Sequence, residues 1–185
     1  RSARRAGRSI ATAGAGLRNR ALTATADRIE SAHDALRRAN AQDMEAAGAA
    51  GISGAMLDRL ELTPSRIEGM ASGLREVAAF SDPVGAVVRM WNRPNGLRVG
   101  KMRIPLGVVA MVYESRPNVT AEAGGLCLKS GNAVILRGGK EALRSNRAIA
   151  GCFAEALAEV GLPAEAIQVV PTTDRAFLME LLRAE

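Results

Sequence analysis

The sequence predicts an α/β fold, in which a Rossmann-like parallel sheet with flanking helices follows an N-terminal helical segment and a β-hairpin. Strand-length apolar runs alternate with amphipathic helical stretches over residues 105–185, which is typical of a parallel sheet covered by helices. The run from Leu106 to Tyr113 is almost unbroken and favours a strand buried on both faces. Residues 3–50 are rich in alanine and poor in β-branched residues, which favours helices.

Helices are expected throughout residues 1–82. Apolar residues recur at helical spacing up to residue 50, and again from Ile67 to Val77. Between these stretches, Ser53 is expected to cap a short helix. Thr63 is followed by a proline, and this pair predicts the cap and the first residue of the next helix.

Residues 83–104 are expected to form a hairpin. Two strands, at 86–91 and 97–103, flank the pair Asn95-Gly96, which favours a tight reversal of the chain. The second strand is polar, as in an edge strand or a projecting ribbon. Because such ribbons often pair with another subunit, this hairpin is a candidate oligomerisation element.

Three parallel strands are expected after the hairpin: the run that ends at Tyr113, and two short runs at 133–136 and 166–170. A strand–helix–strand unit crosses over right-handed, so the loops after the first two strands open at the same carboxyl edge of the sheet. Ligands bind at this edge in open α/β sheets. We therefore expect any site to contain residues 114–120 and 137–140.

The formal charge of +6 comes from 25 basic and 19 acidic residues, and the surplus lies at the N-terminus. Residues 1–26 contain six arginines and no acidic residue, whereas the remainder is balanced. Three interpretations are open: a first helix with a solvated arginine face, an arginine-rich transit peptide, or a phosphate-binding tail. Because no basic cluster lies on the remaining body, we expect no nucleic-acid partner.

No apolar run approaches the roughly 18 residues of a membrane helix, so we expect no membrane partner. Cys127 and Cys152 lie in expected helices, without metal-ligand spacing or a disulfide framework. These features favour a reducing, cytoplasmic environment and no metal site. The chain begins at Arg1 and ends at Glu185 within a helical pattern that lacks a stop signal, so we expect a fragment cut at both ends.

The expected site contains neither Gly-x-Gly-x-x-Gly nor a Walker-type phosphate loop. Gly138 and Gly139 follow the second strand, between Arg137 and Lys140. Two residues without a Cβ atom allow a ligand to approach the backbone closely, although the pair is equally compatible with a plain turn. The single histidine, His33, lies on an expected solvated face, where a catalytic role is not expected.

Several long runs closely resemble one family. They are Pro105-Leu-Gly-Val-Val109, Tyr113-Glu-Ser-Arg-Pro-Asn-Val-Thr120 and Cys127-Leu-Lys-Ser-Gly-Asn-Ala-Val-Ile-Leu-Arg-Gly-Gly-Lys-Glu141. In this order they are similar to the gamma-glutamyl phosphate reductases, or glutamate-5-semialdehyde dehydrogenases, of the aldehyde dehydrogenase superfamily. The resemblance covers nearly the whole chain. It implies that residues 1–82 and 105–185 belong to a cofactor-binding domain of which this chain is one part, and that the catalytic domain is absent.

The resemblance also implies a reaction of proline biosynthesis: NADPH reduces L-glutamyl 5-phosphate to L-glutamate 5-semialdehyde and phosphate. A cysteine thiolate attacks the acyl phosphate and forms a thioester, which splits the reduction into two easier steps. The family carries this cysteine in a later segment, and the apolar surroundings of Cys127 and Cys152 suit core packing. The chain is therefore expected to be inactive alone. Expected partners are glutamate 5-kinase and further copies of the same protein.

The resemblance assigns roles to a few residues. Asn118 occupies the position of the superfamily's oxyanion-binding asparagine, although a helix cap is an equal alternative. Arg137 stands where the superfamily has a lysine on the cofactor ribose, and its fork could hold a 2′-phosphate. The other candidates are phosphate contacts or solvated residues (Arg116, Lys140), ribose contacts (Gly138, Gly139) and a pyrophosphate site at the last helix (Thr172, Thr173).

Two other function classes compete with the reductase. One is a non-catalytic α/β module that binds a nucleotide, and the other is a basic-tailed interaction protein that binds RNA or an anionic surface. A cysteine motif downstream of Glu185 would favour the enzyme. A salt-dependent interaction with RNA would favour the third class.

Overall fold

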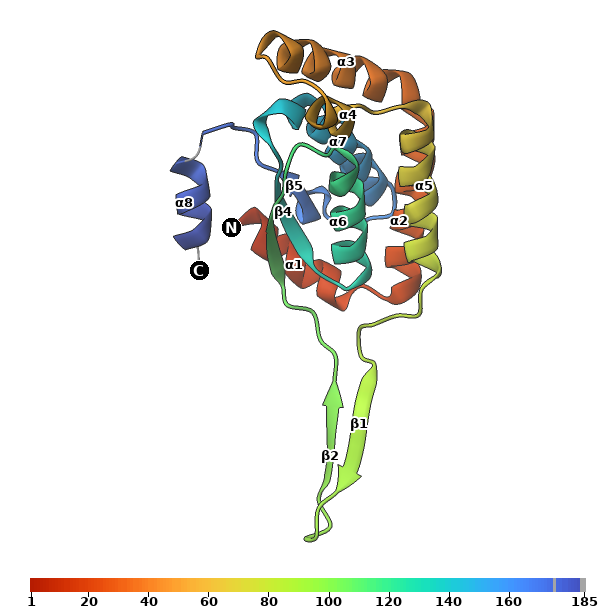
Figure 1. The fold of residues 1–185 in the computed structure, drawn as a ribbon. Coiled ribbons are helices and arrows are strands. Elements are labelled where there is room, and N and C mark those ends of the chain that lie inside the picture. The colour runs from red at the N-terminus through yellow and green to blue at the C-terminus, as the bar shows by residue number, and fades with distance from the viewer. Residues whose placement is uncertain (175, 184–185) are drawn as a thin grey trace.

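The computed structural model describes residues 1–174 and 176–183. It has a body of helices packed around a small sheet, from which a long hairpin projects (Figure 1). The expected continuation of the last helix to Glu185 lies outside the described residues. Among the described helices, none combines the length and the apolar character that a bilayer-spanning segment requires.

Five helices precede the hairpin, as expected: α1 (Ser2–Thr12), α2 (Ala15–Ser31), α3 (His33–Ala49), α4 (Ala55–Leu60) and α5 (Pro64–Ala79). Thr63 caps α5, because its side-chain oxygen accepts the Arg66 N–H at 3.2 Å. The expected Ser53 cap is wrong. The residue before α4 is Gly54, whose φ of 59° is a conformation that glycine adopts without steric cost.

The hairpin consists of β1 (Val87–Asn92) and β2 (Arg98–Met102), paired antiparallel. The reversal is a longer loop, at 93–97, in which the Gly96 N–H donates to the Arg93 carbonyl. Gly96 has a φ of 85°, whereas Asn95 has no positive φ, so the two-residue turn expected at Asn95-Gly96 is not formed. Figure 1 shows the hairpin extending well away from the body. Most of its apolar side chains are exposed in this single chain.

The sheet contains β3 (Val108–Val112), β4 (Ala133–Arg137) and β5 (Ile167–Val169), all parallel and in that spatial order. The connecting helices are α6 (Asn118–Lys129) and α7 (Leu143–Glu159), and α8 (Ala176–Arg183) follows β5. This alternation confirms the predicted α/β architecture. Val112 pairs with Arg137, so β3 and β4 end at the same edge of the sheet.

The expectation that the first strand is buried on both faces is wrong. Residues of β3 alternate between exposed and half-buried, and the Val112 side chain is 56% exposed. The strand lies at the edge of the described sheet, whereas the central strand β4 contains three fully buried residues. The apolar run therefore marks one buried face and one face that the described elements leave open.

The core lies between the sheet and the helices α2, α5, α6 and α7. Two glycines on α6 let these helices approach closely. A Cβ atom at Gly124 would lie 2.9 Å from the Phe153 ring, and one at Gly125 would lie 2.6 Å from the Leu74 side chain. The fully buried side chains around them are mostly aliphatic (Leu22, Ile29, Leu74, Leu128, Leu136, Phe153).

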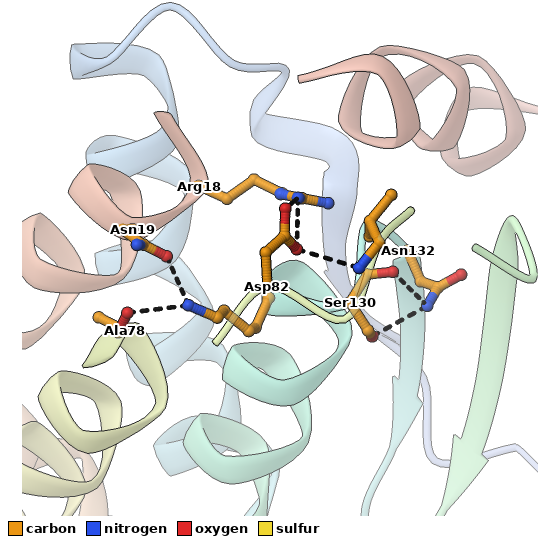
Figure 2. Close-up of polar contacts among 8 residues, drawn as sticks. Arg18, Asn19, Ala78, Asp82, Ser130 and Asn132 are labelled. Atoms are coloured by element: carbon orange, nitrogen blue, oxygen red, sulfur yellow. Dashed lines mark hydrogen bonds and ion pairs between the residues drawn. The ribbon is translucent and has the colours of Figure 1, made fainter. Parts of the chain in front are cut away.

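A buried arginine holds the base of the hairpin (Figure 2). Arg18 is only 1% exposed, and its Nη2 atom donates to both carboxylate oxygens of Asp82, at 2.8 and 2.7 Å. Asp82 also accepts the Val84 N–H at 3.1 Å. Lys129 lies close by and donates to the Asn19 side chain and the Ala78 carbonyl. The pair thus connects α2 to the segment that leads into β1.

The expected solvated arginine face is correct for most of the N-terminal arginines. Arg1, Arg4, Arg5, Arg8 and Arg20 are exposed, while the apolar face of α1 packs against β4. For Arg18 the expectation is wrong, because this side chain is buried. Its charge is compensated by Asp82, which lies 64 residues away in the sequence.

Candidate functional site

The two loops that follow β3 and β4 lie side by side at the carboxyl edge of the sheet. The Tyr113 N–H donates to the Arg137 carbonyl at 3.1 Å, which continues the strand pairing by one residue. The Ser115 hydroxyl donates to the Glu141 carboxylate at 2.6 Å and ties one loop to the other. Asn118 and Gly139 therefore sit at the same edge, as the crossover argument predicts.

A buried chain of polar side chains fixes the starts of α6 and α7. The hydroxyls of Tyr113 and Thr120 are 2.7 Å apart, and Thr120 donates to Asn146 at 2.9 Å. Thr120 and Asn146 are both fully buried. Burial raises the pKa of Tyr113 above its ordinary value, an effect that the Thr120 hydroxyl partly opposes. Such a network orders the loops that carry the candidate residues.

Gly138 and Gly139 are needed for packing within the protein. A Cβ atom at Gly138 would overlap the Asn146 amide and contact the Tyr113 ring, and one at Gly139 would overlap the Ser115 hydroxyl. The space opened by the missing side chains is thus filled by protein atoms. The expectation that this space admits a ligand needs correction, although other backbone atoms of the same loop can still face one.

One pocket, of about 470 Å³, opens beside the start of α6 and contains two of the predicted residues, Arg116 and Asn118. Asn118 is the first residue of α6 and makes no capping bond; its amide donates to Glu122 at 2.8 Å. The helix-cap alternative is therefore not what the structure shows. The residues that line this pocket come from α4, α5, α6 and the loop that precedes α6 (Arg59, Arg66, Gly69, Met70, Arg116, Asn118, Glu122).

Glu114 forms ion pairs with two arginines. It lies 2.9 Å from Arg116 Nε and 3.2 Å from Arg59 Nη1. It thereby connects the loop after β3 to helix α4.

A second pocket, of about 570 Å³, opens at the start of α7 and contains the predicted residues Lys140 and Thr173. Arg144 and Arg147 line it as well, together with Leu143. The lining residues in the described part of the chain include three cations and no carboxylate. This pocket therefore has the charge of a phosphate-binding site.

Arg137 and Thr172 lie near this second pocket without lining it. Arg137 donates to the Gly138 carbonyl and, at 3.1 Å, to the Thr173 carbonyl. The hydroxyl of Thr172 accepts the Asp174 N–H at 3.1 Å, and the Asp174 carboxylate accepts the Ala176 N–H at 2.8 Å. These local bonds occupy the N–H groups of Asp174 and Ala176, at and just before the start of α8.

Glu141 follows β4 and accepts a hydrogen bond from the Ser115 hydroxyl, in the loop after β3. Its burial favours the neutral form, but the Ser115 hydroxyl, its own backbone N–H and the charges of Lys140 and Arg137 outweigh this effect. The net result is a pKa below the ordinary value for glutamate. The carboxylate therefore stays charged at neutral pH and holds the two loops together.

Neither cysteine is suited to nucleophilic catalysis. Both are buried, and burial raises the pKa of Cys127. Burial, together with the Glu155 charge, raises the pKa of Cys152 to about 11. At neutral pH almost no thiolate is present at either position, as expected for core cysteines.

Five charged residues of the pockets did not emerge from the sequence: Arg59, Arg66, Glu122, Arg144 and Arg147. Lys140, Arg144 and Arg147 are spaced by four and three residues, a pattern that places three cations on one helical face. Glu122 follows Asn118 by one helical turn, so its position beside Asn118 could also have been predicted from the sequence. The approach of Arg59 to the site had no local signal, because it depends on the packing of α4 against the rest of the body.

Comparisons with known proteins agree with this architecture. A model of the aldehyde dehydrogenase family matches residues 1–185. A protein of Nitratidesulfovibrio vulgaris (strain DP4) named gamma-glutamyl phosphate reductase is 57% identical over 185 residues, which are 100% of this chain and 44% of that protein.

Two crystal structures of gamma-glutamyl phosphate reductase are also similar. The one from Thermotoga maritima has a TM-score of 0.93 at 37% identity and covers 98% of this chain and 44% of its own. The one from Saccharomyces cerevisiae has a TM-score of 0.87 at 32% identity and covers 94% of this chain and 45% of its own. The chain thus spans less than half the length of these relatives. Because the family model matches every residue, the chain belongs to the aldehyde dehydrogenase family.

Proposed function

We propose that this chain is part of an NADPH-dependent reductase that converts L-glutamyl 5-phosphate to L-glutamate 5-semialdehyde and phosphate in proline biosynthesis. The observation that carries the proposal is the 57% identity, over the whole chain, to a protein named for this activity. The geometry supports it, because one edge of the sheet presents an amide and arginines in one pocket, and a second pocket whose charged lining residues are all cations.

The second pocket supports NADPH as the cofactor. Sites for NAD commonly place a carboxylate on the 2′-hydroxyl of the ribose, whereas a 2′-phosphate is held by a basic residue. Lys140, Arg144 and Arg147 provide such residues, and the lining of this pocket in the described chain has no acidic side chain to oppose a phosphate. Arg137 would reach the nucleotide after exchanging its bond to the Thr173 carbonyl. Thr172, Gly138 and Gly139 remain proposed contacts through their backbone atoms.

When bound, the nicotinamide would supply the hydride that reduces the acyl group. The residues of this chain would bind and polarise the substrate. The Asn118 amide would donate to the carbonyl oxygen on which negative charge develops, and its second N–H remains for this after the bond to Glu122. Arg116 would hold the phosphate until it leaves with the electron pair of the broken C–O bond. The attacking cysteine would come from outside this chain, which we expect to be inactive alone.

The remaining proposals concern assembly and context. The hairpin exposes Val87, Val88, Met90, Leu97 and Met102 by more than half, which supports its role as a contact with another copy of the protein. We propose that residues 83–104 form this oligomerisation element, between the N-terminal helices at 1–82 and the Rossmann-like part at 105–185. A glutamate 5-kinase would supply the acyl phosphate, and the reaction would take place in the cytoplasm.

The test is an assay of the complete protein in the dehydrogenase direction. L-glutamate 5-semialdehyde, inorganic phosphate and NADP⁺ should give NADPH, measured by its absorbance. Omission of phosphate should abolish the signal, because the thioester then has no phosphate acceptor. Nucleotide binding without turnover by the complete protein would instead support a non-catalytic nucleotide-binding module and refute the proposal.

A further inference from the structure

We infer that the pocket beside Asn118 recognises the head group of an α-amino acid, with Arg59 binding its carboxylate and Glu122 binding its ammonium group. The inference rests on the proposed function and deepens it, because it states which groups of the substrate occupy this pocket. The charged residues that line this pocket of about 470 Å³ are three arginines and one glutamate.

Arg66 is already committed within the protein. Its Nη1 atom donates to the carbonyl oxygens of Asp58 and Glu61, and its Nη2 atom lies 3.2 and 3.3 Å from the carboxylate oxygens of Asp58. These bonds satisfy carbonyl groups at the end of α4 and tie this helix to α5. Arg66 therefore has a structural role, and the other two arginines remain for a ligand.

Arg59 and Arg116 share a single carboxylate. Glu114 lies 3.2 Å from Arg59 Nη1 and 2.9 Å from Arg116 Nε, and it is more than half exposed. Two guanidinium groups against one solvated carboxylate leave local positive charge and several N–H donors. A second carboxylate, from a ligand, would complete this arrangement with charge-assisted hydrogen bonds.

Glu122 has the opposite character. Its carboxylate accepts a hydrogen bond from the Asn118 amide at 2.8 Å. Among the ion pairs of the described residues, none includes Glu122, although three arginines line the same pocket. A carboxylate on a residue that lines a pocket, without a cationic partner, is suited to a positively charged ligand group, and an ammonium group has three donors for it.

The spacing agrees with a glutamyl chain. Three carbon–carbon bonds separate its γ-carbonyl carbon from its α-carbon, a reach of about 4 Å when extended. Asn118 and Glu122 are one helical turn apart on α6, a rise of about 5–6 Å. With the reacting carbonyl at Asn118, the α-carbon would therefore lie within reach of Glu122, with its carboxylate directed towards Arg59.

The experiment compares two aldehydes with the complete protein, NADP⁺ and phosphate: L-glutamate 5-semialdehyde, and glutarate semialdehyde, which lacks only the α-amino group. We expect Glu122→Gln to reduce the wild-type preference for the amino acid, measured as a ratio of kcat/KM, by roughly tenfold or more. The loss should appear in KM, and the rate with glutarate semialdehyde should hardly change. Arg59→Met should lower kcat/KM for both aldehydes alike, because both carry the carboxylate.

Two variants outside the pocket serve as matched controls. Glu76→Gln on α5 and Arg38→Met on α3 change the same charges at exposed positions and should keep wild-type kinetics. Circular dichroism and the dissociation constant of NADPH report on folding and on the cofactor site, and both should be unchanged in Glu122→Gln.

The outcomes separate the two proposals. A wild-type protein that oxidises neither aldehyde would overturn the proposed reductase function and this inference with it. A wild-type protein that oxidises the amino acid in a phosphate-dependent manner, with a preference that Glu122→Gln leaves intact, would overturn the inference alone.

Discussion

The ion pair between Arg18 and Asp82 provides a quantitative prediction. Asp82→Asn keeps the shape of the side chain and removes its charge, so that Arg18 becomes an unpaired cation. Arg18 is 1% exposed, and its Nε and Nη1 atoms have no hydrogen-bond partner in the described structure. Breaking a buried pair costs about 3–5 kcal/mol. Because the Asp82 side chain is 29% exposed, water can compensate part of this loss, and we expect about 2–3 kcal/mol.

The free energy of unfolding can be measured by urea denaturation of the 185-residue chain, followed by circular dichroism. The double variant Arg18→Met/Asp82→Asn removes both charges and should recover at least about 1 kcal/mol relative to Asp82→Asn alone. Glu159→Gln is the matched control, because it breaks the exposed pair with Arg28 and should cost about 1 kcal/mol or less. The reasoning is refuted if Asp82→Asn costs no more than this control, or if the double variant recovers nothing.

Three further predictions concern the site. Gly139→Ala should destabilise the chain by about 1–3 kcal/mol in urea denaturation, because the added methyl group overlaps the Ser115 hydroxyl. A second change, Ser115→Ala, should relieve part of this cost. If it relieves nothing, this clash is not the cause. Glu141→Gln should destabilise the folded chain at neutral pH. The pKa of Glu141 is lowered in the folded chain, so its charge contributes stability above the ordinary pKa of glutamate, and this contribution disappears as the pH falls through the folded-state pKa. Denaturation curves of both chains should therefore converge in acid, and a difference that is independent of pH would contradict this. In the complete protein, Arg147→Met should raise the dissociation constant of NADPH by about tenfold or more and leave that of NADH unchanged, as measured by calorimetry; equal losses for both would remove Arg147 from the 2′-phosphate site.

The sequence was sufficient to predict most of the fold, because the main signals are local. Apolar spacing determines the helices α1–α3, and Thr63 with the following proline determines the start of α5. The parallel strands and the right-handed crossover then place the loops of Asn118 and Gly139 at one edge, without any knowledge of side-chain packing. For this reason, the positions of the two loops that carry the candidate site were predictable.

The tertiary structure decided the contacts between residues that are far apart in the sequence. It paired Arg18 with Asp82 and placed Arg59 beside Asn118. It also left one face of β3 open, because an apolar run reports the character of a strand and not the number of elements that cover it. Local sequence encodes backbone conformation through propensity and periodicity, whereas the environment of a charge depends on which distant segment packs against it. The sequence alone therefore determined the architecture and the edge that carries the site, and only the folded chain decided which charges meet there.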